Sequence, residues 1–465
     1  MKVSNVLIML ACFLLLHQNN VQAHNSGKWV ELKPTGTPPT GEVYHSAAAV
    51  GETLYVCGGS TNHNHTHYYD ITINQWVEEP DAALFHNALA ADMDEVGGVL
   101  YLFGGKDTTS SGKGDGKGYV SDLYTYKTGR KNAKWRKIAT ANSPPRRDGH
   151  ATTALKGFIF MFGGWDETQY FNDLHVFDST KLVATGAGGT QLITWSELKT
   201  IPSTPLPGKR NSHSMVSIGS SMFVYGGFTH DVKNSGPWVY CNKEEHGCTI
   251  YDDLWSLNVP GTLDYANPNI QWIKLTPGGE DGKPEGRWEH DAATIGDEMY
   301  LFGGLTADNT ILNDLWAYSK SNNAWRRLKS RENGVFGHVM VASSGSLYVF
   351  GGNINIQRTT TNALWEFKTI LEEEEEEDGE GIIPADGDNQ CFNSKSGKSV
   401  HTYVALTFWL VFVFFLCFIG FLYTYTRNIG GSGARNGRRR SYLELHTNTS
   451  SSAGNNEGEK AYTAL

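Results

Sequence analysis

The sequence predicts an all-β protein: a six-bladed β-propeller closed by its N-terminal strand, plus one transmembrane α-helix near the C-terminus. Six of the adjacent glycine pairs each end a short apolar run, and single tryptophans recur between the runs. The pairs begin at Gly58, Gly104, Gly163, Gly226, Gly303 and Gly351. A repeat near 50 residues built from short strands is typical of a radial β array, in which each sheet buries its faces against its neighbours.

Each repeat fits four strands. A histidine opens the first strand, the apolar run forms the second, an aromatic-rich segment forms the third, and the tryptophan lies on the fourth. The histidines are His45, His86, His150, His213, His290 and His338. Glycine allows positive φ and close backbone approach near the axis, and aromatic rings fill the wedges between blades. We therefore interpret these repeated positions as architecture.

The sixth repeat lacks a tryptophan on its fourth strand. Trp29 stands in the segment KWVEL, which is similar to the segments that follow Trp272 and Trp325. We therefore expect the N-terminal strand to complete the last blade, which removes the free edge of the sheet. Together these residues resemble kelch repeats over residues 28–370. The resemblance implies a kelch-like propeller and leaves the function open.

Composition divides the chain into five parts. An apolar run between Lys2 and Ala23 has the pattern of a secretory signal peptide. The acidic run Glu372–Asp378 self-repels and predicts an extended stalk. The expected parts are a signal peptide at 1–23, the propeller at 24–370, the stalk at 371–401, a transmembrane helix at 402–425 and a disordered cytoplasmic tail at 426–465.

The uncharged stretch Tyr403–Tyr423 is long enough, at ~1.5 Å per residue, to cross a bilayer. A basic cluster at Arg438–Arg440 follows it, and the positive-inside bias places that side in the cytosol. We therefore expect a single-pass type I protein of the plasma membrane or an endomembrane, with the propeller extracellular or luminal.

One face of the propeller is predicted to bind a ligand. By strand order, the long connections at 106–120, 199–210, 228–251 and 274–287 share this face, here called the insertion face. Arg147, Arg210 and Arg287 stand three residues before the histidines of three consecutive blades. Guanidinium groups suit carboxylates, and the kelch resemblance implies contact with acidic peptides. The alternative is that each arginine stacks on an aromatic ring or braces a loop.

The 228–251 loop carries Trp238 and Tyr240 beside two closely spaced cysteines. We expect a disulfide between Cys241 and Cys248, because the propeller is predicted to face an oxidising compartment. A stapled loop with aromatic residues loses little entropy on binding, so it is a second candidate contact element. Cys391 in the stalk is left over and permits a disulfide-linked homodimer.

Short motifs predict modification and sorting. Asn64 begins a glycosylation sequon. Alternate histidines in His63–His67 could hold zinc or copper, but a glycan on Asn64 would crowd them, so no metal site is predicted. In the tail, Tyr442 and Leu445 resemble an endocytic sorting signal. Thr463 and Leu465 end the chain as in C-terminal ligands of PDZ domains, for which a cytoplasmic adaptor would be the partner.

The formal net charge of −10 argues against nucleic acid as a partner. No nucleophile elbow or phosphate loop is present, so we predict no catalytic residue and no cofactor, and leave an enzyme as uncertain. The favoured function is a cell-surface or endomembrane propeller that docks a protein or anionic ligand through the loops of one face. Two alternatives stay open: a galactose-oxidase-like or mutarotase-like sugar-modifying ectoenzyme, and an endomembrane cargo-sorting receptor.

Overall fold

The computed structural model describes residues 27–60, 65–79, 90–107, 118–130, 133–181, 183–185, 190–201, 204–230, 247–261, 263 and 270–369. These residues belong to one compact unit, Met1–Glu376. The predicted signal peptide, stalk, transmembrane helix and cytoplasmic tail all lie outside the described residues.

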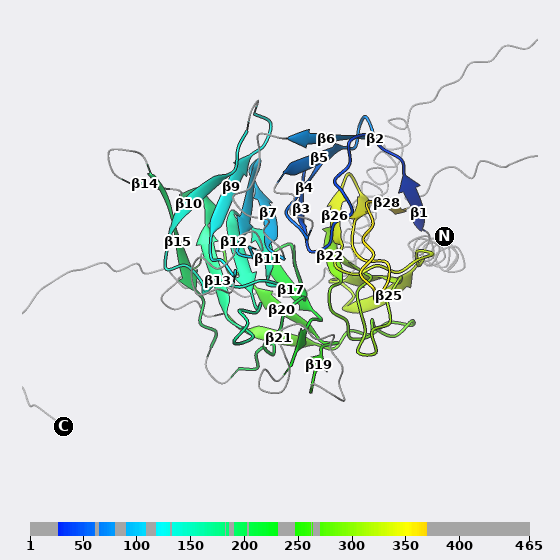
Figure 1. Ribbon diagram of the computed structural model, residues 1–465. Helices are drawn as coiled ribbons and strands as arrows, with labels where there is room; N and C mark the ends of the chain where they lie inside the picture. Colours follow the sequence, from blue (N-terminus) through cyan, green and yellow to red (C-terminus); the bar gives the residue numbers. More distant parts are fainter. Residues whose placement is uncertain are drawn as a thin grey trace, which may run out of the picture. The chain divides into compact units, whose positions relative to one another are not determined.

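Six blades, each a unit of four antiparallel strands, surround a common axis (Figure 1). Blade 1 holds β3 (Ser46–Val50), β4 (Thr53–Cys57), β5 (Thr66–Asp70) and β6 (Gln75–Glu79), and blade 2 holds β7 (Asp92–Val96), β8 (Val99–Phe103), β9 (Leu123–Lys127) and β10 (Arg136–Ala141). Blade 3 holds β11 (Ala151–Leu155), β12 (Phe158–Phe162), β13 (Leu174–Asp178) and β15 (Thr190–Glu197), and blade 4 holds β16 (Ser214–Ile218), β17 (Ser221–Tyr225), β20 (Leu254–Asn258) and β21 (Trp272–Leu275). Blade 5 holds β22 (Asp291–Ile295), β23 (Glu298–Phe302), β24 (Leu315–Ser319) and β25 (Ala324–Leu328).

Blade 6 confirms the predicted closure. Its strands are β26 (Val339–Ser343), β27 (Ser346–Phe350), β28 (Leu364–Thr369) and the N-terminal β1 (Gly27–Leu32). β1 pairs with β28 antiparallel, with Trp29 opposite Phe367 and Glu31 opposite Trp365. The innermost strands β3, β7, β11, β16, β22 and β26 each contact the next, and β26 contacts β3. The ring is therefore closed in two ways. The inner strands form an unbroken circle, and the N-terminal strand β1 completes the sheet of blade 6.

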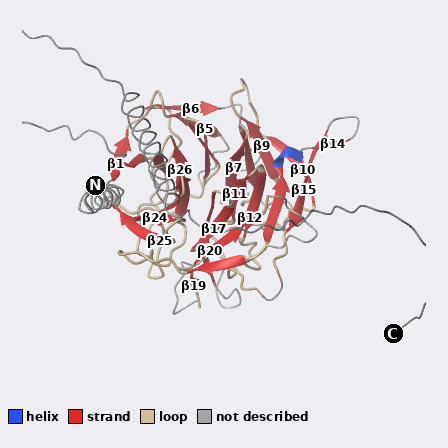
Figure 2. Cartoon of the chain, turned by 180° about the vertical axis from the view of Figure 1, so that it is seen from behind, coloured by secondary structure: helices blue, strands red, loops and turns tan. Residues whose placement is uncertain are grey.

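Short elements lie outside the four-stranded units. β2 (Thr35–Gly36) pairs in parallel with β6, and β10 pairs in parallel with β15, so the outer strands of blades 2 and 3 are joined. β14 (Val183–Thr185) pairs with β15, and β18 (Phe228–Thr229) pairs with β19 (Thr249–Ile250). The one helical element in the described ranges is the 3-10 turn Ser179–Lys181, and Figure 2 shows it among strands and loops.

Tryptophans fill the wedges between blades, as predicted. In five of the junctions, the tryptophan of one blade packs on the aromatic residue that precedes the glycine pair of the blade before it. The ring-centroid distances are 4.8 Å for Trp29 and Phe302, 5.0 Å for Trp76 and Phe350, 5.0 Å for Trp195 and Phe103, 5.3 Å for Trp272 and Phe162, and 5.5 Å for Trp325 and Tyr225.

The first glycine of a pair makes room for the histidine of the next blade. At Gly163, where φ is +68°, an added Cβ would lie 2.6 Å from Cε1 of His213 and 2.8 Å from the carbonyl oxygen of Arg210. His213 in turn packs edge-on against Phe162, at 5.5 Å between ring centroids. The second glycine, Gly164, donates its N–H to that same Arg210 carbonyl at 2.8 Å. The pair Gly163 and Gly164 is thus a junction between blades 3 and 4.

The same arrangement recurs at the other described histidines, and burial keeps the rings neutral. Burial lowers the pKa of His45 to about 4 and that of His290 to about 3. These observations agree with the architectural interpretation of the repeat. His86 lies outside the described residues. The N–H groups of Tyr44 in blade 1 and Ala90 in blade 2 make equivalent hydrogen bonds to the preceding blade, so Ala91 occupies in blade 2 the place that His45 has in blade 1.

The prediction of a plasma-membrane or endomembrane location is corrected here. It depended on a spanning helix, and no helix in the part of the chain that the structure describes is long and apolar enough to cross a bilayer. The expected span at 402–425 lies outside that part.

Candidate functional site

The loops of the insertion face have a hydrophobic core of their own. We call this cluster the loop platform. Its buried members are Tyr119, Trp165, Tyr170, Phe228, Cys248, Trp288, Leu305 and Phe336. They come from the connections of blades 2 to 6 rather than from the strands of the blades. The loops therefore pack on one another and form a continuous layer over the blades.

Backbone bridges hold the loop platform. In blades 3 to 6, the residue after the glycine pair pairs with the residue that follows the arginine position of the same blade: Trp165 with Asp148, Phe228 with Asn211, Leu305 with Trp288 and Asn353 with Phe336. Aromatic contacts then run from loop to loop, with centroid distances of 4.4 Å for Trp165 and Tyr170, 5.8 Å for Tyr170 and Phe228, and 4.7 Å for Phe228 and Trp288. These contacts hold the described loops in fixed positions.

A ring of six backbone hydrogen bonds encircles the axis beneath the platform. The N–H of each member donates to the carbonyl of the equivalent residue in the preceding blade, at 2.8–3.1 Å. The members are Tyr44, Ala90, Gly149, Ser212, Glu289 and Gly337, and all six have positive φ between 53° and 63°. We call this the axial ring. It fixes the distance between the six blades at the point where their inner strands begin.

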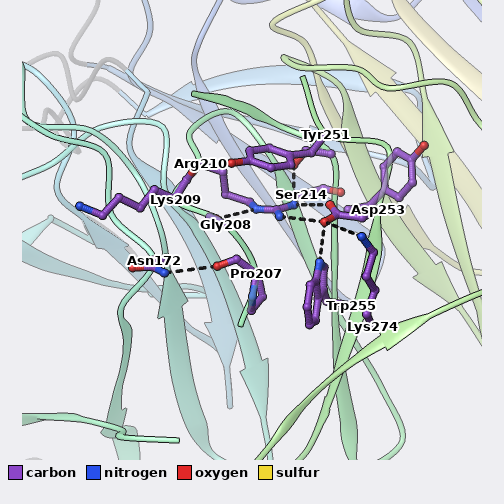
Figure 3. A network of polar contacts seen from close by, with 12 residues as sticks. Asn172, Pro207, Gly208, Lys209, Arg210, Ser214, Tyr251, Asp253, Trp255 and Lys274 are labelled. Carbon is purple, nitrogen blue, oxygen red and sulfur yellow. Dashed lines mark hydrogen bonds and ion pairs between the residues drawn. The ribbon is translucent and has the colours of Figure 1, made fainter. Parts of the chain in front are cut away.

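The three predicted arginines lie just below the loop platform and are fully buried. Figure 3 shows the arrangement at Arg210. Its Nη1 and Nη2 donate to the two carboxylate oxygens of Asp253 at 2.9 and 3.3 Å, and its Nε donates to the carbonyl of Gly208 at 3.0 Å. Its Nη1 also donates to the carbonyl of Gly226, and the guanidinium lies 4.1 Å over the ring of Tyr251.

Arg147 and Arg287 repeat this pattern. Arg147 pairs with Asp173 at 2.6 and 2.9 Å, and Arg287 pairs with Asp314 at 2.7 and 2.9 Å. Each also donates to the first glycine of its own blade, Gly163 or Gly303. Burial alone would raise the pKa of Asp314, but its bonds to Arg287 outweigh burial and hold that pKa below its usual value. The geometry is that of a brace, the second of the two interpretations, and we leave the arginines out of the ligand surface.

The other predicted site residues are mostly outside the described residues. These are Asn64, Trp238, Tyr240, Cys241, Cys391, Tyr442, Leu445, Thr463 and Leu465, whose roles stay predictions. Cys248 is described and lies buried in the loop platform. Cys57 is buried on β4, where burial raises the pKa of its thiol to about 12.

Asp148 is a member of this region that the sequence analysis missed. Its side chain is 5% exposed, and burial raises its pKa to about 8 against the attraction of Lys106. It follows Arg147 directly, a position held by Asn211 and Trp288 in the next blades. The sequence signal that could have revealed Asp148 is a charged residue at a position that is uncharged in the next two blades.

A cavity of about 320 Å³ follows the axis between the inner strands. Its described lining includes Asp92, Asp94, Glu95 and Asp291 together with small side chains such as Ala48. A smaller cavity of about 130 Å³ adjoins the axial ring and includes Glu289, whose carboxylate accepts a hydrogen bond from Tyr44 at 2.9 Å. Within the described residues, no group of three or more His, Cys, Asp or Glu side chains is placed to hold a metal ion.

Six sheets joined by glycine pairs, interlocked histidines and a shared axial ring define a β-propeller of kelch type. The chain belongs to the kelch-repeat family: the family described as KLHDC2/KLHL20/DRC7 Kelch-repeats domain matches residues 78–259 and 242–398, and the Kelch motif matches residues 43–82.

Curated relatives carry the same repeats. The chain is 25% identical over 312 residues to "Kelch domain-containing protein 3" of Homo sapiens, covering 63% of this chain and 72% of that protein. It is 26% identical over 324 residues to "Kelch domain-containing protein 1" of Mus musculus, covering 61% of this chain and 68% of that protein. It is also 27% identical over 318 residues to "Host cell factor" of Drosophila melanogaster, of which it covers only 18%.

Among solved structures, the chain is similar to the one titled "Structure of YjhT". The TM-score is 0.51 at 17% identity, and the match covers 71% of this chain and 95% of the other. At that identity the likeness supports the propeller fold alone.

Proposed function

We propose that this protein is a kelch-propeller binding scaffold that holds a protein partner on the loop platform of its insertion face. The observation that carries the proposal is the separate hydrophobic core of the platform, which packs loops of blades 2 to 6 into one layer. The kelch-domain relatives support a binding scaffold as the general class.

Prior ordering of the loops is the physical reason for this choice of face. A loop that orders only on binding costs conformational entropy, whereas a loop already packed on its neighbours presents its surface at little further cost. Here the bridge between Asn353 and Phe336 ties the connection of blade 6 to the platform. The next residues of that connection, Ile354 and Ile356, are 45% and 50% exposed. An ordered loop with exposed apolar side chains suits contact with another protein.

The chemistry of the arginines does not favour an anionic ligand. Their guanidiniums are 0% exposed, and each one is neutralised by an aspartate of its own blade. A partner that docks on the connection of blade 6 would instead meet the exposed aliphatic side chains of Ile354 and Ile356. We therefore propose a protein partner rather than a small anion.

The test is cross-linking of the full chain in its native cells, with the cross-linked peptides mapped by mass spectrometry. We expect the double change Ile354→Ser and Ile356→Ser to remove the cross-links to the partner. The matched control is Ile73→Ser, which changes another exposed isoleucine in the turn between β5 and β6, at the other end of β5 from the insertion face. Loss of the partner in the control, or its retention in the double variant, would contradict the proposed surface.

A further inference from the structure

The innermost strands of two blades carry an aspartate at the same position. Asp92 is the first residue of β7 in blade 2, and Asp291 is the first residue of β22 in blade 5. The first residues of the other inner strands are Ser46, Ala151, Ser214 and Val339. In a ring of six blades, blades 2 and 5 lie opposite each other. The two carboxylates therefore face the axis from opposite sides.

Each carboxylate joins its own blade to the next. Oδ2 of Asp92 accepts a hydrogen bond at 2.6 Å from the backbone N–H of Thr152, on β11 of blade 3. Oδ2 of Asp291 accepts one at 2.6 Å from the N–H of Met340, on β26 of blade 6. The other oxygens accept from Met93 and Ala292 on their own strands. In both bonds to the neighbouring blade, the donor N–H belongs to the inner strand of that blade. Without the carboxylate, this N–H would face the cavity.

The cavity around these carboxylates brings further acids. On its own strand Asp92 has Asp94 and Glu95, and Asp291 faces it across the axis. From β3 and β11 the neighbours of Asp92 are alanines and threonines, with His45 and His150 near the axial ring. Around Asp291 the neighbouring strands bring Ser214, His213 and His338, and Glu289 lies at the mouth.

Among the described lining residues of both cavities there is no lysine or arginine. The histidines do not supply positive charge, because burial first, and nearby arginines second, lower the pKa of His150, His213 and His338. Backbone N–H donors are therefore what compensates the negative charge of these carboxylates. The other charged side chains around them are also acidic.

We propose that Asp92 and Asp291 form a proton-linked clasp, which joins blade 2 to blade 3 and blade 5 to blade 6 and stabilises the fold most when the carboxyl groups carry protons. Ionisation of both would place two charges on opposite sides of one narrow cavity, with Asp94 as a third. The uncharged state keeps an acceptor oxygen for the neighbouring blade and removes that repulsion.

The titration behaviour supports the clasp. Burial raises the pKa of Asp291 to about 7 and that of Asp94 to about 6. For Asp92, burial first and then the charges of Asp94 and Asp291 raise the pKa well above its ordinary value, despite the bond from Thr152. A carboxyl group whose pKa is higher in the folded than in the unfolded chain stabilises the fold fully below the unfolded pKa of about 3.9. That stabilisation is lost as the pH rises through the folded pKa, here between about 6 and 7 for Asp94 and Asp291.

The buried histidines act in the opposite direction, since their lowered pKa values favour the fold above pH 6.5. The test therefore compares variants with the natural chain rather than following one protein. The melting temperature of the full chain is measured from pH 5 to pH 8 for the natural protein, for Asp92→Asn combined with Asp291→Asn, and for Asp297→Asn. Asp297 is exposed in the turn of blade 5 after β22, so it controls for the removal of one surface charge.

We expect the double variant to gain melting temperature relative to the natural chain, by several degrees, as the pH rises from 5 to 8. We expect Asp297→Asn to keep a constant difference. An unchanging difference for the double variant would overturn the clasp.

A second measurement decides the question if the double variant does not fold. In the natural chain with ¹³C at the aspartate carboxyl carbon, NMR should show aspartates that titrate above pH 5, and Asp148→Asn should remove one of them because Asp148 is also buried. Asp94→Asn should remove another, because burial raises the pKa of Asp94 to about 6. If no aspartate other than Asp94 and Asp148 titrates above pH 5, the clasp is overturned.

Discussion

The carboxylate of Asp314 accepts hydrogen bonds from both terminal nitrogens of Arg287, at 2.7 and 2.9 Å, although the two residues are 27 positions apart in the chain. Arg287 precedes the innermost strand β22, and Asp314 directly precedes the third strand β24. Nη1 of Arg287 also reaches the carbonyl of Gly303, at the end of the strand between them. One guanidinium thus binds the same end of three neighbouring strands.

Removal of this arginine should be strongly destabilising. We expect Arg287→Ala to lower the free energy of unfolding by about 3–5 kcal/mol, because it leaves the buried carboxylate of Asp314 without its cation. The combined change Arg287→Ala and Asp314→Ala should cost less than the sum of the two single changes, since the second removes the uncompensated charge. Urea unfolding measures both, and additive costs would contradict the brace.

Acid should weaken the braces. The pKa values of Asp173, Asp253 and Asp314 are held below normal by their arginines against the opposing effect of burial. A carboxylate with a lowered pKa stabilises the fold above the unfolded pKa of about 3.9, and the contribution is lost as the pH falls further. We therefore expect Asp314→Asn to show a smaller loss of stability than the natural chain between pH 5 and pH 2, followed by circular dichroism. An equal loss in both proteins would count against the prediction.

The glycine pairs should tolerate no side chain at the first position. Gly163→Ala combines positive φ with contact against His213 and Arg210, whereas Gly51→Ala has positive φ and no atom within 4 Å of the added Cβ. We expect about 1–2 kcal/mol of destabilisation at Gly51 from the backbone alone. At Gly163 overpacking should add about 1–3 kcal/mol. Equal losses in the two variants would show that crowding between blades is unimportant.

Closure by the N-terminal strand should depend on one side chain. Trp29 packs at 4.8 Å from Phe302 and at 5.1 Å from Phe367, and its Nε1 donates to the carbonyl of Lys329 at 2.8 Å. We expect Trp29→Ala to cost about 3 kcal/mol and to raise hydrogen exchange in β28 first. The control is Lys28→Ala, an exposed neighbour on the same strand. If the control matched Trp29→Ala, closure would not rest on the tryptophan.

The repeat made most of the fold predictable. Glycine pairs and tryptophans must recur because every junction between blades has the same geometry, and the segment around Trp29 revealed the closing strand for the same reason. The predicted membrane location was wrong, because the part of the chain that the structure describes has no helix that could cross a bilayer. It came from residues 402–425, which are not part of the repeat.

The role of the arginines could not be predicted from their spacing alone. A rim position and a buried brace have the same place in the repeat, and only contacts decide between them. The sequence did hold one signal: each blade with Arg147, Arg210 or Arg287 has an aspartate before the leucine of its third strand, although blade 2 has Asp122 at that position without an arginine. Blade 6, which has Val335 in place of the arginine, has Ala363 in place of the aspartate.

The axial carboxylates were missed for a different reason. Asp92 and Asp94 alternate along β7, so both point to one side of the strand. Such alternation in a sequence is usually assigned to a face exposed to solvent, and here that face of the strand lines the cavity along the axis of the ring. The chain alone does not distinguish the outside of a protein from a cavity along its centre.

The axial ring has an evolutionary consequence. Its six hydrogen bonds join main-chain atoms, and residues as different as Tyr44, Ala90 and Gly149 occupy it. Amino-acid replacements at these sites leave the N–H and carbonyl groups in place, apart from proline. Lineages could therefore exchange the surrounding connections, and with them the molecules recognised, while the blades remain spaced as before.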